Sequence, residues 1–308
     1  PREDRCNLET WDPAVNANTR AVDKTGAATA VVASLPESLP EAVATNLMEK
    51  GIAPLCGIRQ ALDAAQATAQ IGVAWRRPVA NMALPGPASP LLESLESLDE
   101  WQAKCELASG GVDVPHGERV DSAEALKKAA RSLTYPLVLK ACDAKLTHKS
   151  DAGAVIIDIG GIDDLAAAGQ TLFARYPNLL VEEMVTDTVC ELIVGVRQDP
   201  VIGPWMMIGS GGIYAELLAD HKVVLLPVQN DDLEQLINSL KISLLLKGYR
   251  GSEPGDMSAL LAGLQKLARF SFEKRDTLME REINPLLVRP KGKGVCAVDA
   301  VLQYARGS

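Results

Sequence analysis

Long apolar runs, an excess of positive charge and paired cysteines are all absent from this sequence. No run of 18 or more apolar residues occurs, so the sequence predicts no segment that spans a bilayer. The opening stretch PREDRCNLETWDP has no apolar core of the kind that a signal peptide needs. The six cysteines are scattered singly without a CxxC pair, which disfavours both a zinc site and a disulfide framework. We therefore expect reduced cysteines in the protein core and a cytoplasmic location.

The charge balance narrows the classes of partner. A formal net charge of -9 at pH 7 leaves no basic footprint for nucleic acid, and nothing in the sequence indicates a membrane partner. Small, specific anions stay compatible with this charge because they need only local attraction. At 308 residues, the chain is long enough for two domains that each bury a core.

Residues 27–75 have the pattern of a small α/β segment. The runs AATAVVAS and IAPLC are short and β-like, and each precedes a stretch with apolar residues at helical spacing. Such alternation is typical of a doubly wound parallel sheet, but two strands make a poor sheet, so we expect the end of a longer domain with an irregular lead-in over residues 1–26. The stretch RRPVANMALPGPASP, with four prolines and one glycine, resembles a linker. The predicted organisation is a first domain at 1–76, a linker at 77–97 and a second domain at 98–308.

The second domain is predicted to mix strands with helices near residues 162–175, 230–240 and 256–270. Several strands follow each other without a helix between them, so we expect partly antiparallel sheets and an overall class of α/β and α+β. A first helix is predicted to end at two glycines, with a strand directly after it. Asp121, followed by Glu124, is the predicted N-cap of the next helix.

The stretch YPLVLKACDAKLTHKSDAGAVIID joins two predicted strands and contains a group of cationic and titratable residues. Lys140 ends an apolar strand, where a buried ammonium is costly unless it meets an anion. The alternative is a lysine whose stem lies along the core while its ammonium reaches solvent. His148 and Lys149 follow in a polar loop, and a histidine can titrate near neutral pH or act as a nucleophile. Alone, His148 is typical of a surface residue, but the grouping favours an anion site.

Three glycines follow another apolar strand, in the stretch IGSGGIYAELLAD. Gly209, Gly211 and Gly212 would let backbone N–H groups approach an oxyanion, as phosphate-binding loops do. The alternative is an ordinary turn, since any turn between a strand and a helix can use glycine.

The stretch EINPLLVRPKGKGVCAVDAV contains candidate ligands for a hard metal ion. Glu282 and Asn284 alternate along one predicted strand, and Asp299 returns on the next. Carboxylate and amide oxygens suit Mg²⁺, which takes few protein ligands and adds phosphate oxygens. The alternative is a set of polar residues on an exposed hairpin, although the flanking residues are apolar enough to be buried.

Taken in order, these motifs resemble the ATP-grasp domain of NDP-forming (ADP-forming) acyl-CoA synthetases. The stretches are YPLVLKACDAKLTHKSDAGAVIIDI, LLVEEMV, CELIVGVRQDPVIGPWMMIGSGGIYAELLADHKVVLLPV, KGYRGSEPGDMSALLAGL, EINPLLV and AVDAVL, and the resemblance covers about residues 98–305. Residues 27–75 resemble the end of the flavodoxin-like CoA-ligase domain that precedes the ATP-grasp domain in single-chain members, such as feruloyl-CoA synthetase-type enzymes. The resemblance implies an ATP-grasp fold of two lobes, preceded by a partial flavodoxin-like parallel α/β segment.

The resemblance also implies roles in binding Mg-ATP. Lys140 would contact the ATP phosphates, and Glu191 would hold the ribose. The remaining implied ATP-binding residues are the interlobe hinge around adenine, Glu183, Met184 and Val185, and the loop glycines Gly209, Gly211 and Gly212. Asn284 and Asp299 match magnesium ligands of the wider succinyl-CoA synthetase group.

Three further residues are implied to be catalytic. His148 lies in a loop that is thought to carry a phosphoryl group in the ADP-forming branch, and Lys149 would offset the charge of that group. Glu282 matches a carboxylate that faces the phosphohistidine. The implied reaction converts ATP, an organic acid and CoA to ADP, phosphate and acyl-CoA through a phosphohistidine relay. The CoA-binding domain and the main acyl-phosphate site of the family have no counterpart in this sequence, so CoA and the acid are expected to bind mainly outside this chain.

Two other functions stay open at this point. The chain could be the synthetase-like regulatory region of a protein lysine acyltransferase, or a nucleotide-responsive interaction module without turnover. The acid, the preference for ATP over GTP and the oligomeric state are not indicated by the sequence, which is compatible with a homo-oligomer.

Overall fold

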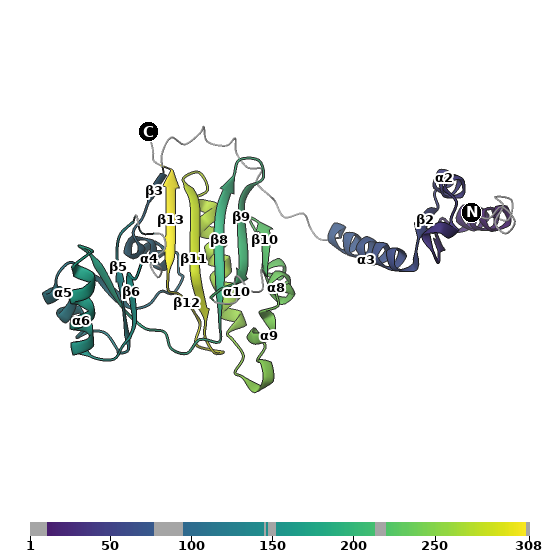
Figure 1. The fold of residues 1–308 in the computed structure, drawn as a ribbon. Coiled ribbons are helices and arrows are strands. Elements are labelled where there is room, and N and C mark those ends of the chain that lie inside the picture. The colour runs from purple at the N-terminus through teal and green to yellow at the C-terminus, as the bar shows by residue number, and fades with distance from the viewer. Residues whose placement is uncertain (1–10, 77–94, 145, 147–151, 213–219, 306–308) are drawn as a thin grey trace. The chain divides into compact units, whose positions relative to one another are not determined.

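The computed structural model describes residues 11–76, 95–144, 146, 152–212 and 220–305. The chain divides into two compact units, Pro1–Asn81 and Met82–Ser308, drawn as a ribbon in Figure 1. Among the residues in those described ranges, no helix is both long and apolar enough to cross a bilayer.

The first unit is built on two parallel strands, as the sequence predicts. β1 (Ala30–Ala33) pairs with β2 (Ala53–Cys56) in parallel. The other elements of this unit are α1 (Asp12–Thr25), η2 (Pro36–Ser38), α2 (Glu41–Glu49) and α3 (Ile58–Trp75). Leu47 and Ile52, at 0% and 1% exposure, form the centre of its small core. Along α3 only Ala61 is buried.

The predicted irregular lead-in over residues 1–26 is wrong for its described part, because α1 is a regular helix. Pro13 lies in its first turn, and Gly26 ends it in the left-handed conformation with a φ of 62°. Both are common helix-boundary residues. Val15 is the only residue of α1 that is fully buried.

The second unit has a small lobe with a four-stranded antiparallel sheet. The strand order is β4 (Gly117–Val120), β7 (Leu179–Glu183), β5 (Leu137–Ala141) and β6 (Val155–Ile159). The helices α5 (Ala123–Ala129) and α6 (Ile162–Phe173) cover one face of this sheet (Figure 1). Leu139 and Val181 point toward these helices and are fully buried. The opposite face carries Lys140 and Glu182.

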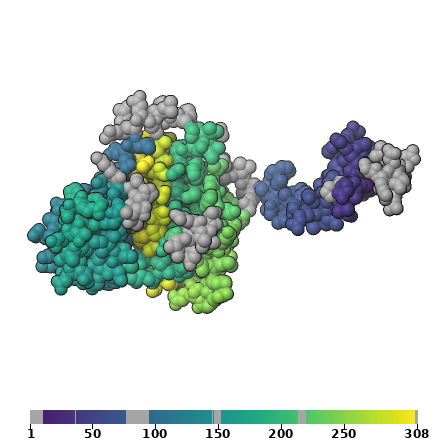
Figure 2. All heavy atoms as spheres, in the orientation of Figure 1, coloured from purple at the N-terminus to yellow at the C-terminus, as the bar shows by residue number. Residues whose placement is uncertain are grey.

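The large lobe has a seven-stranded antiparallel sheet in the order β10, β9, β8, β11, β13, β3, with β12 also paired to β11. Its strands are β3 (Leu95–Ser97), β8 (Cys190–Asp199), β9 (Gly203–Ser210), β10 (His221–Leu225), β11 (Leu278–Val288), β12 (Val295–Ala297) and β13 (Ala300–Ala305). Its helices are α4 (Glu100–Ser109), α8 (Asn230–Ser239), α9 (Ser243–Leu246) and α10 (Met257–Glu273), with the short η3 (Tyr249–Gly251). Along β8, Leu192 and Val194 point into the core that α8 and α10 share, so Glu191 and Ile193 point to the other face. The atoms of the two lobes lie directly against one another (Figure 2).

The structure confirms the mixed fold class and corrects several local predictions. Ser122, not Asp121, is the N-cap of α5, because its hydroxyl accepts a hydrogen bond from the Ala125 N–H at 3.3 Å. The strand expected directly after α4, the first helix of the second domain, begins only at Gly117.

The expectation that all cysteines are buried is also wrong in part. Cys56 and Cys105 are exposed, one at the end of β2 and the other on the outer side of α4, while the other three described cysteines are buried. All five described cysteines are free thiols.

Candidate functional site

Lys140 lies in a buried ring of four charged side chains at the interface of the two lobes. Its Nζ is 2.7 Å from Glu100 Oε1 and 3.1 Å from Glu182 Oε2, and it donates a hydrogen bond to the Val298 carbonyl oxygen. Lys104 Nζ lies 2.5 Å from Glu182 Oε1 and 2.8 Å from Glu100 Oε1. The four side chains are between 0% and 8% exposed. Two ammonium groups and two carboxylates thus balance in the protein interior.

The ring draws its members from both lobes. Glu100 and Lys104 lie one turn apart on α4, which packs into the large-lobe core. The start of this helix is fixed by a capping box, in which the Asp99 carboxylate accepts from Gln102 N at 2.9 Å and the Gln102 side chain accepts from Asp99 N at 3.1 Å. Lys140 and Glu182 lie on the neighbouring strands β5 and β7 of the small lobe, two residues apart in register. The lobes are therefore held together here by charge as well as by packing.

Lys140 stays protonated near neutral pH. Burial lowers the pKa of its ammonium, but the carboxylates of Glu100, Glu182 and Asp299 together outweigh burial and raise the pKa above the usual value of a lysine. The alternative of an ammonium that reaches solvent does not hold, since Lys140 is 7% exposed. The anions that Lys140 meets in this structure are carboxylates of the protein itself.

Asn284 and Asp299 lie opposite each other beside this ring, Asn284 on β11 and Asp299 in the segment between β12 and β13. In β11, Ile283 pairs with Val194 of β8, and Leu286 pairs with Leu192. Two residues of β11 thus lie opposite one residue of β8, which is a β-bulge, and Asn284 is one of the two. Bulges redirect side chains and often lie next to active sites. The Asn284 N–H donates to the Asp299 carbonyl oxygen at 3.1 Å, and the charge of Asp299 acts on Lys140. Two of the sequence motifs thus converge on one place.

The donor set at the bulge fits Mg²⁺ by its chemistry. Asn284 is exposed, whereas Asp299 and Glu282 are partly buried, so the exposed-hairpin alternative describes Asn284 alone. The sequence analysis placed Asp299 on a strand, but this residue lies between β12 and β13. In the described part of the chain, no group of three or more His, Cys, Asp or Glu residues is placed to hold a metal. Amide and carboxylate oxygens in small number are what Mg²⁺ uses when phosphate oxygens complete its shell.

Glu191, Gly211 and Gly212 line a cavity of about 390 Å³ at the beginning of β8. The Gly211 N–H donates to the Glu191 carbonyl oxygen at 2.8 Å. A Cβ at Gly211 would lie 2.9 Å from the carbonyl carbon of Leu192, so this approach of two backbones requires glycine. Gly212 has a φ of +61°, and a Cβ there would overlap the Glu191 carboxylate.

Gly209 is not part of this cavity. It pairs with His221 in the ladder between β9 and β10. A Cβ at Gly209 would lie 2.9 Å from the His221 Cβ, so the close packing of these two strands explains this glycine without a ligand.

Glu183, Met184 and Val185 line a second cavity of about 520 Å³ at the connection between the lobes. The Glu183 N–H donates to the His116 carbonyl oxygen at 2.9 Å, which ties the end of β7 to the segment before β4. The Met184 N–H donates to the Pro136 carbonyl oxygen at 2.9 Å. These bonds fix the backbone on which the predicted adenine contacts depend.

An ion pair between Asp187 and Arg289, with Lys293 beside it, lines the hinge cavity. The Arg289 guanidinium donates to both carboxylate oxygens of Asp187, at 2.7 Å from Nε and 3.0 Å from Nη2, and Lys293 Nζ lies 3.0 Å from Oδ2. The hydrogen bond from Arg289 is the main cause that lowers the pKa of Asp187 to about 2. The sequence did not single out this pair.

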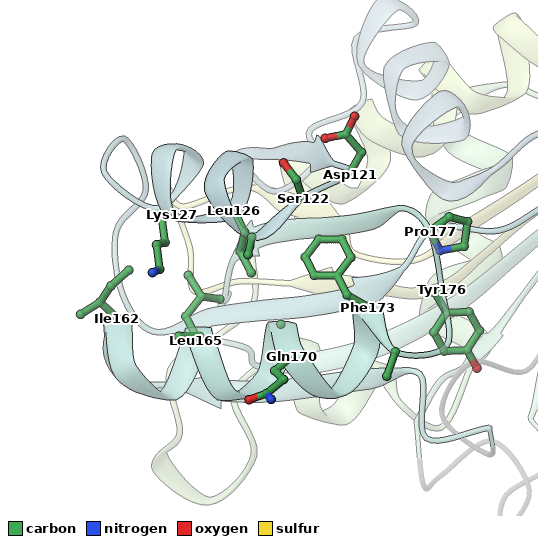
Figure 3. A pocket seen from close by; sticks show the side chains of 14 residues that line it. Asp121, Ser122, Leu126, Lys127, Ile162, Leu165, Gln170, Phe173, Tyr176 and Pro177 are labelled. Carbon is green, nitrogen blue, oxygen red and sulfur yellow. The ribbon is translucent and has the colours of Figure 1, made fainter.

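A cavity of about 760 Å³, larger than either of these, lies between α5 and α6 (Figure 3). Its lining is largely apolar, with Leu126, Leu165 and Phe173 pointing into it and Lys127 at its edge. None of the catalytic, ATP-binding or metal-binding residues predicted from the sequence lines it. Its size alone does not make it the functional site, because the charged groups and candidate ligands lie elsewhere.

The predicted catalytic residues His148 and Lys149 lie outside the described residues. Among described residues, the sequence analysis missed Glu100, Lys104 and Glu182. Glu100 and Lys104 have the spacing of an i, i+4 ion pair, which is common on exposed helices, and Glu182 directly precedes the predicted hinge. Their burial depends on the contact between the lobes, which local patterns do not reveal.

Comparison with known proteins identifies relatives of the second unit. Residues 91–303 match the ATP-grasp domain family. The chain is 33% identical over 216 residues to a trans-feruloyl-CoA synthase from an unknown prokaryotic organism. It is 29% identical over 219 residues to the beta subunit of the ADP-forming acetate–CoA ligase II of Pyrococcus furiosus. The match covers 67% of this chain and 30% of the feruloyl-CoA synthase, but 68% of this chain and 92% of the beta subunit.

A solved structure shares the fold. It is the acetyl-coenzyme A synthetase 1 of Ca. Korarchaeum cryptofilum in complex with coenzyme A and Mg-AMPPCP, with the phosphohistidine segment pointing towards the nucleotide-binding site. The TM-score is 0.60 at 31% sequence identity, and the match covers 68% of this chain and 93% of that chain.

Proposed function

Because the chain belongs to the ADP-forming acyl-CoA synthetase family and carries its ATP-grasp domain, we propose that it binds Mg-ATP between its two lobes and starts phosphoryl transfer toward an acyl-CoA product. The observation that supports this most is the proximity of Lys140, Asn284 and Asp299 at the lobe interface, although they come from distant segments. A cation beside two oxygen donors is the combination that a metal–phosphate complex needs.

In this proposal, the chain orients the nucleotide through separate groups. Glu183, Met184 and Val185 border the adenine, and Glu191 holds the ribose. Lys140 gives its ammonium to the phosphates.

Asn284 and Asp299 hold Mg²⁺, which when bound offsets charge on the phosphate oxygens. Glu282 lies two residues before the bulge on β11 and faces the group that accepts the phosphoryl. It carries a carboxylate, which can orient and stabilise a protonated imidazole.

The proposed relay begins at His148. Its imidazole nitrogen attacks the γ-phosphorus, the bond to the bridging oxygen breaks, and ADP leaves. The phosphoryl group then passes to the carboxylate of an organic acid, and the CoA thiolate displaces phosphate from the acyl phosphate to form the thioester. Lys149 offsets the charge of the phosphorylated loop. The phosphohistidine segment of the Korarchaeum relative, which points towards its nucleotide-binding site, supports a carrier of this kind.

The acid, CoA and the protein that completes the reaction are also part of the proposal. Of the relatives named above, one is named for feruloyl-CoA and two are named for acetate or acetyl-coenzyme A. The proposal therefore specifies the substrate only as an organic acid. We infer that the first unit is the end of a CoA-ligase domain, and that CoA and the acid bind mainly on parts of that domain outside residues 1–308. A cytoplasmic location belongs to the same proposal.

A thermal melt of the chain tests the nucleotide site. A ligand at 100 times its Kd that binds only the folded state adds about 2.7 kcal/mol, which corresponds to about 5–10 °C for a unit of this size. We expect a rise of that order with Mg-ATP, and none with ferulate or acetate plus CoA. The same samples, assayed for thioester, should give none. No shift with Mg-ATP would refute the nucleotide site, and thioester from the chain alone would refute the assignment of CoA and acid to another segment.

A further inference from the structure

Lys140 shares both of its carboxylate partners with a second buried lysine. Lys104 Nζ lies within 2.8 Å of three carboxylate oxygens, two of Glu182 and one of Glu100. It is 1% exposed and lines neither the hinge cavity nor the cavity beside Glu191. Lys104 is therefore placed to act on the site through Glu100 and Glu182 rather than by touching a ligand.

We propose that Lys104 is a positioning residue of the nucleotide site, which neutralises Glu100 and Glu182 so that the Lys140 ammonium is available to the phosphates. This inference rests on the proposed function. Lys104 and Lys140 each contact both carboxylates of the ring.

The charge count explains why one lysine does not suffice. With Lys104 present, the ring of two carboxylates and two ammonium groups is neutral, and Asp299 adds one negative charge nearby. Without Lys104, the ring would hold two buried carboxylates and only the Lys140 ammonium. A polyanionic ligand would then approach a site with an added negative charge in a region of low dielectric, where interactions between charges are strong.

The geometry lets Lys140 change partners without stranding a carboxylate. Its contact to Glu182 Oε2, at 3.1 Å, is the longest of the ring, whereas Lys104 donates to both oxygens of Glu182 at 2.5 Å and 2.7 Å. When Lys140 turns toward a phosphate, Glu182 keeps a full ammonium partner. A buried carboxylate left without a partner would be strongly destabilising.

The same contacts make α4 part of the site. Ala103 and Leu107 fix this helix in the large-lobe core, both at 1% exposure or less, while Lys104 reaches across to the small lobe. These contacts thus fix the position of Lys140 on β5 relative to the large lobe, where Asn284 and Asp299 lie.

A series of variants that remove, rebalance or keep the charge separates this role from simple structural support. The variants are Lys104→Met, which gives the ring a net negative charge; Lys104→Met with Glu100→Gln, which restores neutrality; and Lys104→Arg, which keeps the charge. For each variant of the 308-residue chain, calorimetry measures the Kd for Mg-ATP and the Kd for uncharged adenosine. The melting temperature of each variant is measured as well.

We expect Lys104→Met to weaken Mg-ATP at least tenfold, about 1.4 kcal/mol, with adenosine changed less than about twofold, since only the phosphates carry charge. The double variant should recover most of the loss, and Lys104→Arg should stay within about threefold of the parent protein, by the logic of a double-mutant cycle. Parent protein that does not bind Mg-ATP would refute the proposed function itself.

Other outcomes bear on Lys104 alone. If Mg-ATP binds the parent protein and Lys104→Met equally, or if the double variant is as weak as the single one, the positioning role is wrong while the proposed function stands. If Lys104→Met does not fold, the double variant and Lys104→Arg decide the question: near-parental Kd values in both support the charge role, and a tenfold loss in either contradicts it.

Discussion

Gly212→Ala is a test of Glu191 that adds only one methyl group to the protein. Gly212 has a φ of +61°, and its added Cβ would overlap the Glu191 carboxylate, so that side chain must move away. The left-handed backbone costs an alanine about 1–2 kcal/mol, and the stiffer unfolded chain returns about 0.4–1 kcal/mol. The net loss of about 1 kcal/mol lowers the melting temperature by about 2–4 °C for a unit of this size.

Gly251→Ala is the matched control for backbone strain. Gly251 has a φ of +85° with no atom within 4 Å of the added Cβ, and it is exposed. Both variants should lose similar stability, but only Gly212→Ala should weaken Mg-ATP, by about tenfold if a ribose hydrogen bond of about 1.5 kcal/mol is lost. Calorimetry with ATP and a melting curve for each variant give both quantities. Equal affinity for ATP in both variants would refute the role of Glu191, and a larger loss of stability in Gly251→Ala would refute the strain argument.

Three other predictions concern the metal, the relay and acid stability. Asp299→Asn should weaken Mg-ATP more than metal-free ATP, because it removes an anionic ligand and keeps the shape; equal losses in titrations with and without Mg²⁺ would make Asp299 structural. His148→Ala, assayed with the complementary CoA-ligase segment, should leave the Kd for ATP nearly unchanged and cut acyl-CoA formation by orders of magnitude, and unchanged turnover would contradict the relay. Arg289 lowers the pKa of Asp187 from 3.8 to about 2. The ionised Asp187 therefore stabilises the folded state above about pH 4, and this stability is lost as the pH falls toward 2. Asp187→Asn should therefore flatten the dependence of the melting temperature on pH between about pH 4 and pH 2, and an unchanged slope would contradict the assignment.

Much of the fold could be predicted because its elements carry strong local patterns. The run CELIVGVRQD alternates buried and partly buried residues from Cys190 to Val196, and it forms β8 over the predicted residues. The family also followed from the order of the motifs, and the comparisons confirm it. By contrast, α1 was missed because Val15 and Val22 are its only large apolar residues.

The site was harder to predict because its chemistry depends on contacts between lobes. Lys140 was singled out from a single apolar strand, but its partner Lys104 lies 36 residues earlier on a helix that packs with the other lobe. Nothing in the local sequence around Glu100 distinguishes a buried carboxylate from a solvated one. The roles of the nucleotide-binding residues stay predictions until binding is measured.

The bulge in β11 also decides which side of the sheet each residue of that strand faces. Before it, the core-facing residues Arg281 and Ile283 have odd numbers; after it, Leu286 and Val288, also in the core, have even numbers. If the same residues formed a regular ladder without the bulge, one half of the strand would turn over, since a shift of one residue exchanges the two faces. With the second half kept in place, Glu282 would enter the core, and Arg281 would leave it for the face that carries Glu191. The extra residue thus lets Ile283 and Leu286 both face the core although three positions separate them.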